Sequence, residues 1–262
     1  MTQFVEIQGE LLAVQLFEPK ERRGDALLIH GYTGSKEDFA DIGPLLADRG
    51  YRVVTFDNRG QYESAHSQRE DAYSILSLAT DAVALADHFG LDHPHLLGHS
   101  FGGLVAQRAA VIAPQRWASL TLLCSGPGAI PGVPELEQAI EVLQAMPMAQ
   151  VWDEYRDADA RQDRSYELMK RRWGVSDARS VITHARHLLT EESIVGQVRG
   201  TGLPVHVVYG ENDDAWPLAM QDRMARDLDA PVTVIADAGH GPNTDQPETT
   251  ATALADFWAQ VH

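Results

Sequence analysis

Six short apolar segments recur along the chain, and they limit its fold more than any other feature. Each has the length of a β-strand, and most lack the polar–apolar alternation of a half-exposed strand, so we expect them to be covered on both faces. They span residues 26–30, 52–57, 95–99, 118–124, 204–209 and 231–236. Such strands are typical of an α/β fold with a mostly parallel sheet between helices.

Helical patterns lie between these strands, as the crossovers of a parallel sheet require. Ser35 and Asp38 form a capping-box pattern that predicts a helix ending at Gly50. The other helices predicted in this part span residues 79–89, 100–112, 218–228 and 248–261. Two β-rich runs near the start, residues 4–7 and 11–17, predict an antiparallel hairpin at the sheet edge.

The alternation stops between Gly126 and Gly200, where the sequence shows no convincing strand. Helical patterns occur there at residues 135–146, 149–158, 166–173 and 178–189. The stretch is too long for a loop. We therefore expect a helical subdomain over residues 126–200, inserted into a core made of residues 1–125 and 201–262.

Charge and composition argue against several kinds of partner. The formal net charge of −17 repels phosphate backbones and anionic lipids. The first residues lack the features of a signal peptide, and no run approaches the roughly 18 apolar residues of a membrane span. We expect a cytoplasmic protein that binds neither nucleic acid nor membrane. The single cysteine, Cys124, and eleven histidines without ligand spacing predict no metal and no cofactor.

A serine stands between two glycines where a predicted strand passes into a predicted helix, in the run Gly98-His99-Ser100-Phe101-Gly102. Such a strand–turn–helix forces the serine into a strained backbone conformation and projects its hydroxyl above the sheet. The helix N-terminus favours negative charge there. Ser100 is therefore the candidate nucleophile. Neighbouring strand residues point to opposite faces, so we expect His99 to be structural and not the base.

Two other predicted strands bring an acid and a base to the same edge of the sheet. One is followed by Glu211, Asp213 and Asp214, and the next by His240. A neutral histidine can take the proton of a serine hydroxyl, and a carboxylate at its other nitrogen fixes the tautomer. We assign His240 as base and favour Asp213 as acid over Asp214 and Glu211.

Acyl transfer also needs two N–H donors for the developing oxyanion. One is expected from Phe101, which follows the nucleophile. The second is expected from the loop His30-Gly31-Tyr32-Thr33-Gly34, with Tyr32 as the favoured donor.

Several aromatic and sulfur-containing side chains are candidates for the substrate pocket. They are Trp216, three residues beyond Asp213, and Trp152, Tyr155 and Met146 in the helical stretch. This stretch also carries a basic run, which is either a solvated helix face or a site for a substrate carboxylate. It comprises Lys170, Arg171, Arg172, Arg179, His184, Arg186 and His187.

Together these elements resemble the α/β-hydrolase superfamily, in its branch with a serine nucleophile. The resemblance spans the whole chain and rests on His30-Gly31, Asp57-Asn58-Arg59-Gly60, Gly98 to Gly103, Gly210 to Pro217, and Ala238-Gly239-His240. The triad follows the family order Ser, Asp, His. The resemblance implies a mostly parallel, twisted sheet of about eight strands flanked by helices, with the insertion as the family's cap. A serine nucleophile argues against the epoxide-hydrolase and haloalkane-dehalogenase branches, which need a carboxylate.

Two details refine the resemblance. Many members follow the D-x-R-G element with His-Gly and a small residue, whereas this chain has Gln61-Tyr62-Glu63-Ser64, so that wall of the site is not defined by the resemblance. Some relatives carry the acid after the sixth strand. Here Cys124-Ser125-Gly126 offers no carboxylate, which favours Asp213.

These features predict an enzyme that hydrolyses a small to medium carboxylic ester or lactone through an acyl-serine intermediate. Two alternatives stay open. The same triad can serve a C–C bond, amide or thioester hydrolase, and the scaffold can serve a ligand-binding or sensor protein with little turnover. The sequence defines neither the substrate nor the oligomeric state.

Overall fold

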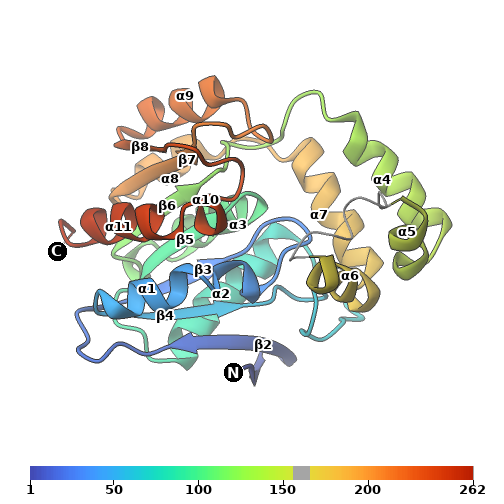
Figure 1. Ribbon diagram of the computed structural model, residues 1–262, viewed down its shortest axis with the longest axis horizontal. Coiled ribbons are helices and arrows are strands. Elements are labelled where there is room, and N and C mark those ends of the chain that lie inside the picture. Colours follow the sequence, from blue (N-terminus) through green and yellow to red (C-terminus); the bar gives the residue numbers. More distant parts are fainter. Residues whose placement is uncertain (156–165, 262) are drawn as a thin grey trace.

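The computed structural model describes residues 1–155 and 166–261, without the side chains of residues 153–155. Within this part of the chain, eight strands form one sheet in the order β1-β2-β4-β3-β5-β6-β7-β8 (Figure 1). They are β1 (Gln3–Ile7), β2 (Glu10–Phe17), β3 (Gly24–Ile29), β4 (Tyr51–Phe56), β5 (His95–His99), β6 (Ser119–Leu123), β7 (Val205–Gly210) and β8 (Val232–Ile235). β2 pairs antiparallel with β1 and β4, and the remaining pairs are parallel. The predicted sheet and its edge hairpin are confirmed.

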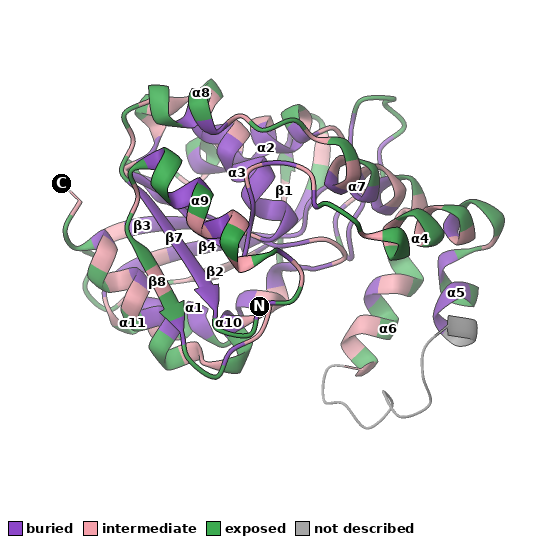
Figure 2. Ribbon diagram, turned by 90° about the horizontal axis from the view of Figure 1, so that it is seen from above, coloured by how far each residue is buried: buried purple, intermediate pink, exposed green. Residues whose placement is uncertain are grey.

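Helices cover both faces of the sheet. One face packs against α2 (Ile75–His88), α3 (Phe101–Ile112), α8 (Val195–Gly200) and α9 (Leu218–Leu228). The other packs against α1 (Ile42–Asp48) and α11 (Pro247–Trp258). In β3, Leu27 and Ile29 enter the first cluster while Ala26 and Leu28 enter the second. Strands β3 to β7 are almost entirely buried, as Figure 2 shows for β7, which explains why their sequences do not alternate. The expected burial of residues 231–236 on both faces is wrong, because β8 is an edge strand in which only Ile235 is buried.

Helices also fill the chain between β6 and β7. They are α4 (Pro134–Ala145), α5 (Met148–Tyr155), α6 (Tyr166–Val175), α7 (Ala178–Thr190) and then α8. In both views α4 to α7 stand beside one end of the sheet (Figures 1 and 2). We call α4 to α7 the helical insertion. α8 falls within residues 126–200 but packs on α3 and α9 of the core.

Residues 61–64, where the sequence departs from the pattern that follows the D-x-R-G element, contact the helical insertion. The side-chain amide of Gln61 donates to the Ser180 hydroxyl of α7 at 2.9 Å. The backbone N–H of Tyr62 donates to the Ser176 hydroxyl, also at 2.9 Å. Residues 61–64 therefore form a docking point for the insertion.

The prediction of one helix from Ser35 to Gly50 is wrong, because this segment forms two separate helices. A 3₁₀ helix, η1 (Lys36–Phe39), precedes α1. Pro44 explains the break: it fits the first turn of α1, but inside a continuous helix its ring would clash with the carbonyl of Ala40. Three short elements that we did not predict are η2 (Pro114–Arg116), α8 and α10 (Pro242–Asp245). Each helix among the described residues is too short or too polar to cross a bilayer.

Candidate active site

Three side chains from separate strands meet at the carboxyl edge of the sheet. Ser100 follows β5, Asp213 follows β7 and His240 follows β8. His240 Nε2 lies 2.9 Å from Ser100 Oγ, and His240 Nδ1 lies 2.8 Å from Asp213 Oδ1. A carboxylate can only accept, so Nδ1 carries the proton and Nε2 can accept from the Ser100 hydroxyl. The geometry suits proton transfer from Ser100 to His240.

Ser100 has the backbone conformation expected at such a turn, with φ 53° and ψ −122°. A positive φ costs a non-glycine residue about 1–3 kcal/mol, so neighbouring bonds must hold it. Its N–H donates to the Leu123 carbonyl at 2.9 Å, and the Ser125 hydroxyl donates to its carbonyl at 2.8 Å. The end of β6 thus fixes the serine.

Two glycines allow the loop after β3 to approach the serine closely. A Cβ on Gly102 would overlap the carbonyl oxygens of Ile29 and His30. A Cβ on Gly31 would lie 3.0 Å from Ser100 Cβ, which is tighter than ordinary contact. The loop of residues 30–34 therefore lies directly against Ser100.

Asp213 has more partners than the sequence indicated. Its carboxylate also accepts from Gln221 Nε2 at 2.8 Å and from the Ala215 N–H at 3.1 Å. Burial disfavours the charged form, yet the hydrogen bonds from His240, Gln221 and Ala215 together hold the pKa of Asp213 below its ordinary value. No motif marked Gln221, because its role depends on how α9 packs.

The side chain of His99 contacts the backbone of the proposed base, His240. His99 Nε2 donates to the His240 carbonyl at 2.7 Å. Burial lowers the pKa of His99 to about 4, so its ring is neutral near pH 7. The structure therefore places His99 as a support for the loop that carries His240.

A cavity of about 510 Å³ opens over the triad. Its lining combines the triad with mainly apolar side chains: Tyr32, Ser100, Ile130, Pro131, Gly132, Val133, Glu135, Leu136, Leu188, Asp213, Asp214, Ala215, Trp216, Pro217 and His240. Of the predicted pocket residues, Trp216 lines this cavity.

Trp152 and Met146 are not part of the described lining. Trp152 packs against Tyr166 and Trp173 within the insertion. Met146 packs against the apolar cluster of the same insertion. The side chain of Tyr155 lies outside the described residues. Ile130, Leu136 and Leu188 line the cavity instead. Sequence reasoning missed them because it weighted aromatic side chains and methionine over aliphatic ones.

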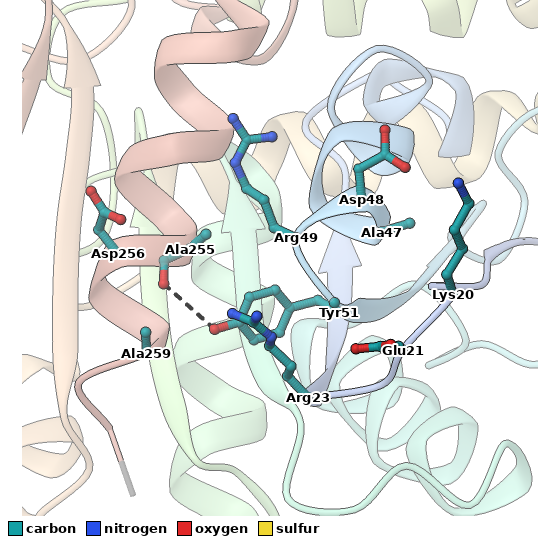
Figure 3. A pocket seen from close by; sticks show the side chains of 11 residues that line it. Lys20, Glu21, Arg23, Ala47, Asp48, Arg49, Tyr51, Ala255, Asp256 and Ala259 are labelled. Atoms are coloured by element: carbon teal, nitrogen blue, oxygen red, sulfur yellow. Dashed lines mark hydrogen bonds between the residues drawn. The ribbon is translucent and has the colours of Figure 1, made fainter.

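A larger hollow, about 670 Å³, lies where β4 begins, at the opposite edge of the sheet (Figure 3). Charged side chains such as Lys20, Arg23 and Asp256 surround Tyr51, whose hydroxyl lies 3.5 Å from the Ala255 carbonyl. The eleven lining residues that the structure describes include no serine, threonine, cysteine or histidine. The smaller cavity over Ser100 is therefore the better candidate for chemistry.

One cluster has the residue types of a metal site. Ligand atoms of His99, Cys124 and His240 lie within 4.8 Å of one another. Both ring nitrogens of His240 are engaged by Ser100 and Asp213. Burial also raises the pKa of the Cys124 thiol, whereas a metal needs the thiolate. The cluster therefore does not suit a metal ion.

The amino-acid sequence is similar to a known protein family and to several characterised hydrolases. The family model described as alpha/beta hydrolase fold matches residues 27–165. A pyrethroid hydrolase from Sphingobium wenxiniae is 28% identical over 253 residues, which cover 89% of this chain and 87% of that protein. Epoxide hydrolase B from Mycobacterium tuberculosis is 33% identical over 153 residues, 55% of this chain and 42% of that protein. The chain thus spans less than half the length of some curated relatives.

Solved structures share the fold across the whole chain. A thermophilic esterase from Thermogutta terrifontis superposes with a TM-score of 0.81 at 22% identity, and the match covers 100% of this chain and 99% of that one.

Proposed function

The chain belongs to the α/β-hydrolase fold family, and on that premise we propose that it is a serine hydrolase acting on a small to medium carboxylic ester or lactone. The hydrogen-bonded series Ser100–His240–Asp213 under an apolar cavity carries the proposal. The relatives named as a pyrethroid hydrolase and an esterase agree with an ester substrate. Epoxide hydrolase chemistry needs a carboxylate nucleophile, and Ser100 occupies that position here.

The proposed reaction has two halves. Ser100 Oγ attacks the carbonyl carbon while His240 Nε2 takes its proton, and Asp213 stabilises the resulting imidazolium. Backbone N–H groups of Tyr32 and Phe101 stabilise the oxyanion. His240 protonates the leaving alcohol, which departs and leaves an acyl-serine. Water, deprotonated by His240, then attacks the acyl group, and His240 returns the proton to Ser100 Oγ as the acid is released.

The cavity supports a substrate with an apolar group. Ile130, Leu136, Leu188 and Trp216 line it beside the triad. We also propose that residues 126–200 act as a cap on a core of residues 1–125 and 201–262, with α8 as the segment that returns the chain to the core. The cytoplasmic location stays a prediction.

A fluorophosphonate probe tests the nucleophile. Intact-protein mass spectrometry should show one adduct on the wild type and none on Ser100→Ala of equal thermal stability. Persistence of the adduct in Ser100→Ala would place the reactive group elsewhere. Absence of any adduct from folded wild type would favour the ligand-binding or sensor alternative.

A panel of p-nitrophenyl esters, a lactone, an anilide, a thioester and a vinylogous diketone then separates the bond types. The highest kcat/KM is expected for an ester or the lactone, measured against Ser100→Ala as the background. Faster cleavage of the diketone, anilide or thioester would move the assignment to that alternative.

A further inference from the structure

The basic run in the helical insertion contains an arginine that turns inward. Arg172 of α6 is 8% exposed, and its Nη2 lies 2.6 Å from Asp38 Oδ1. Asp38 belongs to η1, which directly follows the loop of residues 30–34. Arg172 therefore pairs with the core and not with a molecule in the cavity, whose described lining does not include it.

Asp38 is fixed to the loop that carries Tyr32. Its carboxylate accepts from the Ser35 N–H at 3.2 Å. A Cβ on Gly34 would overlap that carboxylate, so the two are in close contact. Asn243 Nδ2 donates to the Asp38 backbone carbonyl at 2.6 Å. A shift of Asp38 would therefore be passed to the loop.

The same loop contacts the insertion through its own side chain. Tyr32 packs against the insertion's apolar cluster of Leu143, Met148, Val151 and Val181. Tyr32 also lines the cavity over Ser100, so the insertion contacts a residue of the site directly.

The second proposed oxyanion donor has a matching contact. Phe101 and His184 of α7 are 0% and 1% exposed, and their rings stack with centroids 4.3 Å apart and an interplanar angle of 22°. Burial lowers the pKa of His184 well below its ordinary value, so the ring is neutral and stacks as an aromatic group.

We propose that the helical insertion positions both oxyanion donors, with Arg172 as a positioning residue that holds the Tyr32 loop through Asp38. The inference rests on the proposed function. Stabilisation of an oxyanion depends steeply on donor distance and angle. Loss of the Arg172–Asp38 pair should therefore act on the transition state more than on substrate binding.

Arg172→Met should lower kcat for a p-nitrophenyl ester by about 10- to 100-fold and change KM by less than about threefold. Arg172→Lys keeps a cation near Asp38 and should recover part of the loss. Arg179→Met is the matched control, because Arg179 also joins the insertion to the core but donates to the carbonyls of Ser67 and Arg69, away from the loop. It should retain kcat within about twofold.

A trifluoromethyl ketone provides a readout that loss of structure alone would not produce. Its hemiketal on Ser100 places an oxyanion between the donors, so its Ki should rise in proportion to the fall in kcat/KM across the Arg172 variants. Asp38→Asn should reproduce the effect, and the double variant Asp38→Asn/Arg172→Met should be little worse than either single variant.

Distinct results would overturn the inference. One is an Arg172→Met enzyme of native thermal stability with unchanged kcat or unchanged Ki. Another is a loss in Arg179→Met equal to that in Arg172→Met, which would indicate general loosening of the insertion. If Arg172→Met does not fold, Asp38→Asn with the same Ki series decides between these outcomes. Failure of fluorophosphonate labelling in the wild type would instead contradict the proposed function itself.

Discussion

The surroundings of Asp213, more than its place in the acidic run, distinguish it from its neighbours. Its side chain is fully buried and accepts hydrogen bonds from three donors. Glu211 and Asp214 are exposed, and Glu211 Oε2 accepts from the Asp237 N–H at 3.3 Å. A carboxylate can hold the tautomer of His240 only where it faces the ring.

Asp213→Asn should therefore lower kcat by about 10⁴-fold, since an amide no longer fixes the imidazole tautomer. Glu211→Gln, at the rival position, should keep kcat within about twofold because that side chain lies in solvent. Initial rates on one ester, with thermal unfolding to verify the fold, check both. Equal losses in the two variants would contradict the assignment of the acid.

The sequence identified candidate residues that lie in local motifs. Ser100 and His240 each lie between glycines after an apolar strand run, so a short motif in its strand context marked them as candidates. Gln221 and the hydrogen bond from His99 to the His240 carbonyl had no such signal. Both depend on contacts between elements that are far apart in the chain.

At the scale of elements, α3 approaches β3 so closely that only glycine fits at Gly102. Gly102→Ala should reduce the free energy of unfolding by about 1–3 kcal/mol, because a backbone carbonyl cannot move aside as a side chain can. Gly196→Ala is the matched helical control, with no atom within 4 Å of the added Cβ, and should stabilise by about 0.5 kcal/mol. Urea unfolding of both variants measures these changes in the free energy of unfolding. A neutral Gly102→Ala would show that the contact can relax.

Strands could be predicted more closely than helices, and the reason is physical. Burial on both faces leaves an apolar run that ends where the strand ends, so residues 95–99 and β5 coincide. Helix boundaries depend on caps, and the cap at Ser74 was not weighed. Ser74 accepts from the Ser77 N–H at 3.2 Å and starts α2 at Ile75, before the expected residue 79. α8 is only six residues long and ends in glycine, so it is too short to show the apolar periodicity of a helix.

Across the whole molecule, the sequence indicated an insertion but not how it docks. Arg172 and His184 read as part of a charged helix face, yet both are buried against the core. Their partners, Asp38 and Phe101, lie over 80 residues away in the chain. Only the packed fold shows that these groups meet.

Buried neutral histidines should make the stability of the whole molecule depend on pH. Burial lowers the pKa of His30, His95, His99 and His206 from 6.5 to about 4. Between pH 6.5 and about 4, the unfolded chain therefore binds more protons than the folded protein. The free energy of unfolding should fall as the pH drops through this range. Each such histidine contributes up to about 1.4 kcal/mol per pH unit.

His206 offers the cleanest test, because burial is the only cause of its lowered pKa. His206→Gln can keep the hydrogen bond to the Thr233 hydroxyl, found at 2.8 Å, but binds no proton in the unfolded chain. Urea unfolding at pH 7.5, 6.0 and 5.0 should give a shallower loss of stability in His206→Gln than in the wild type. The exposed histidine variant His88→Gln should follow the wild-type curve. If His206→Gln also follows that curve, the ring of His206 takes up a proton in the folded protein, and burial does not hold it neutral.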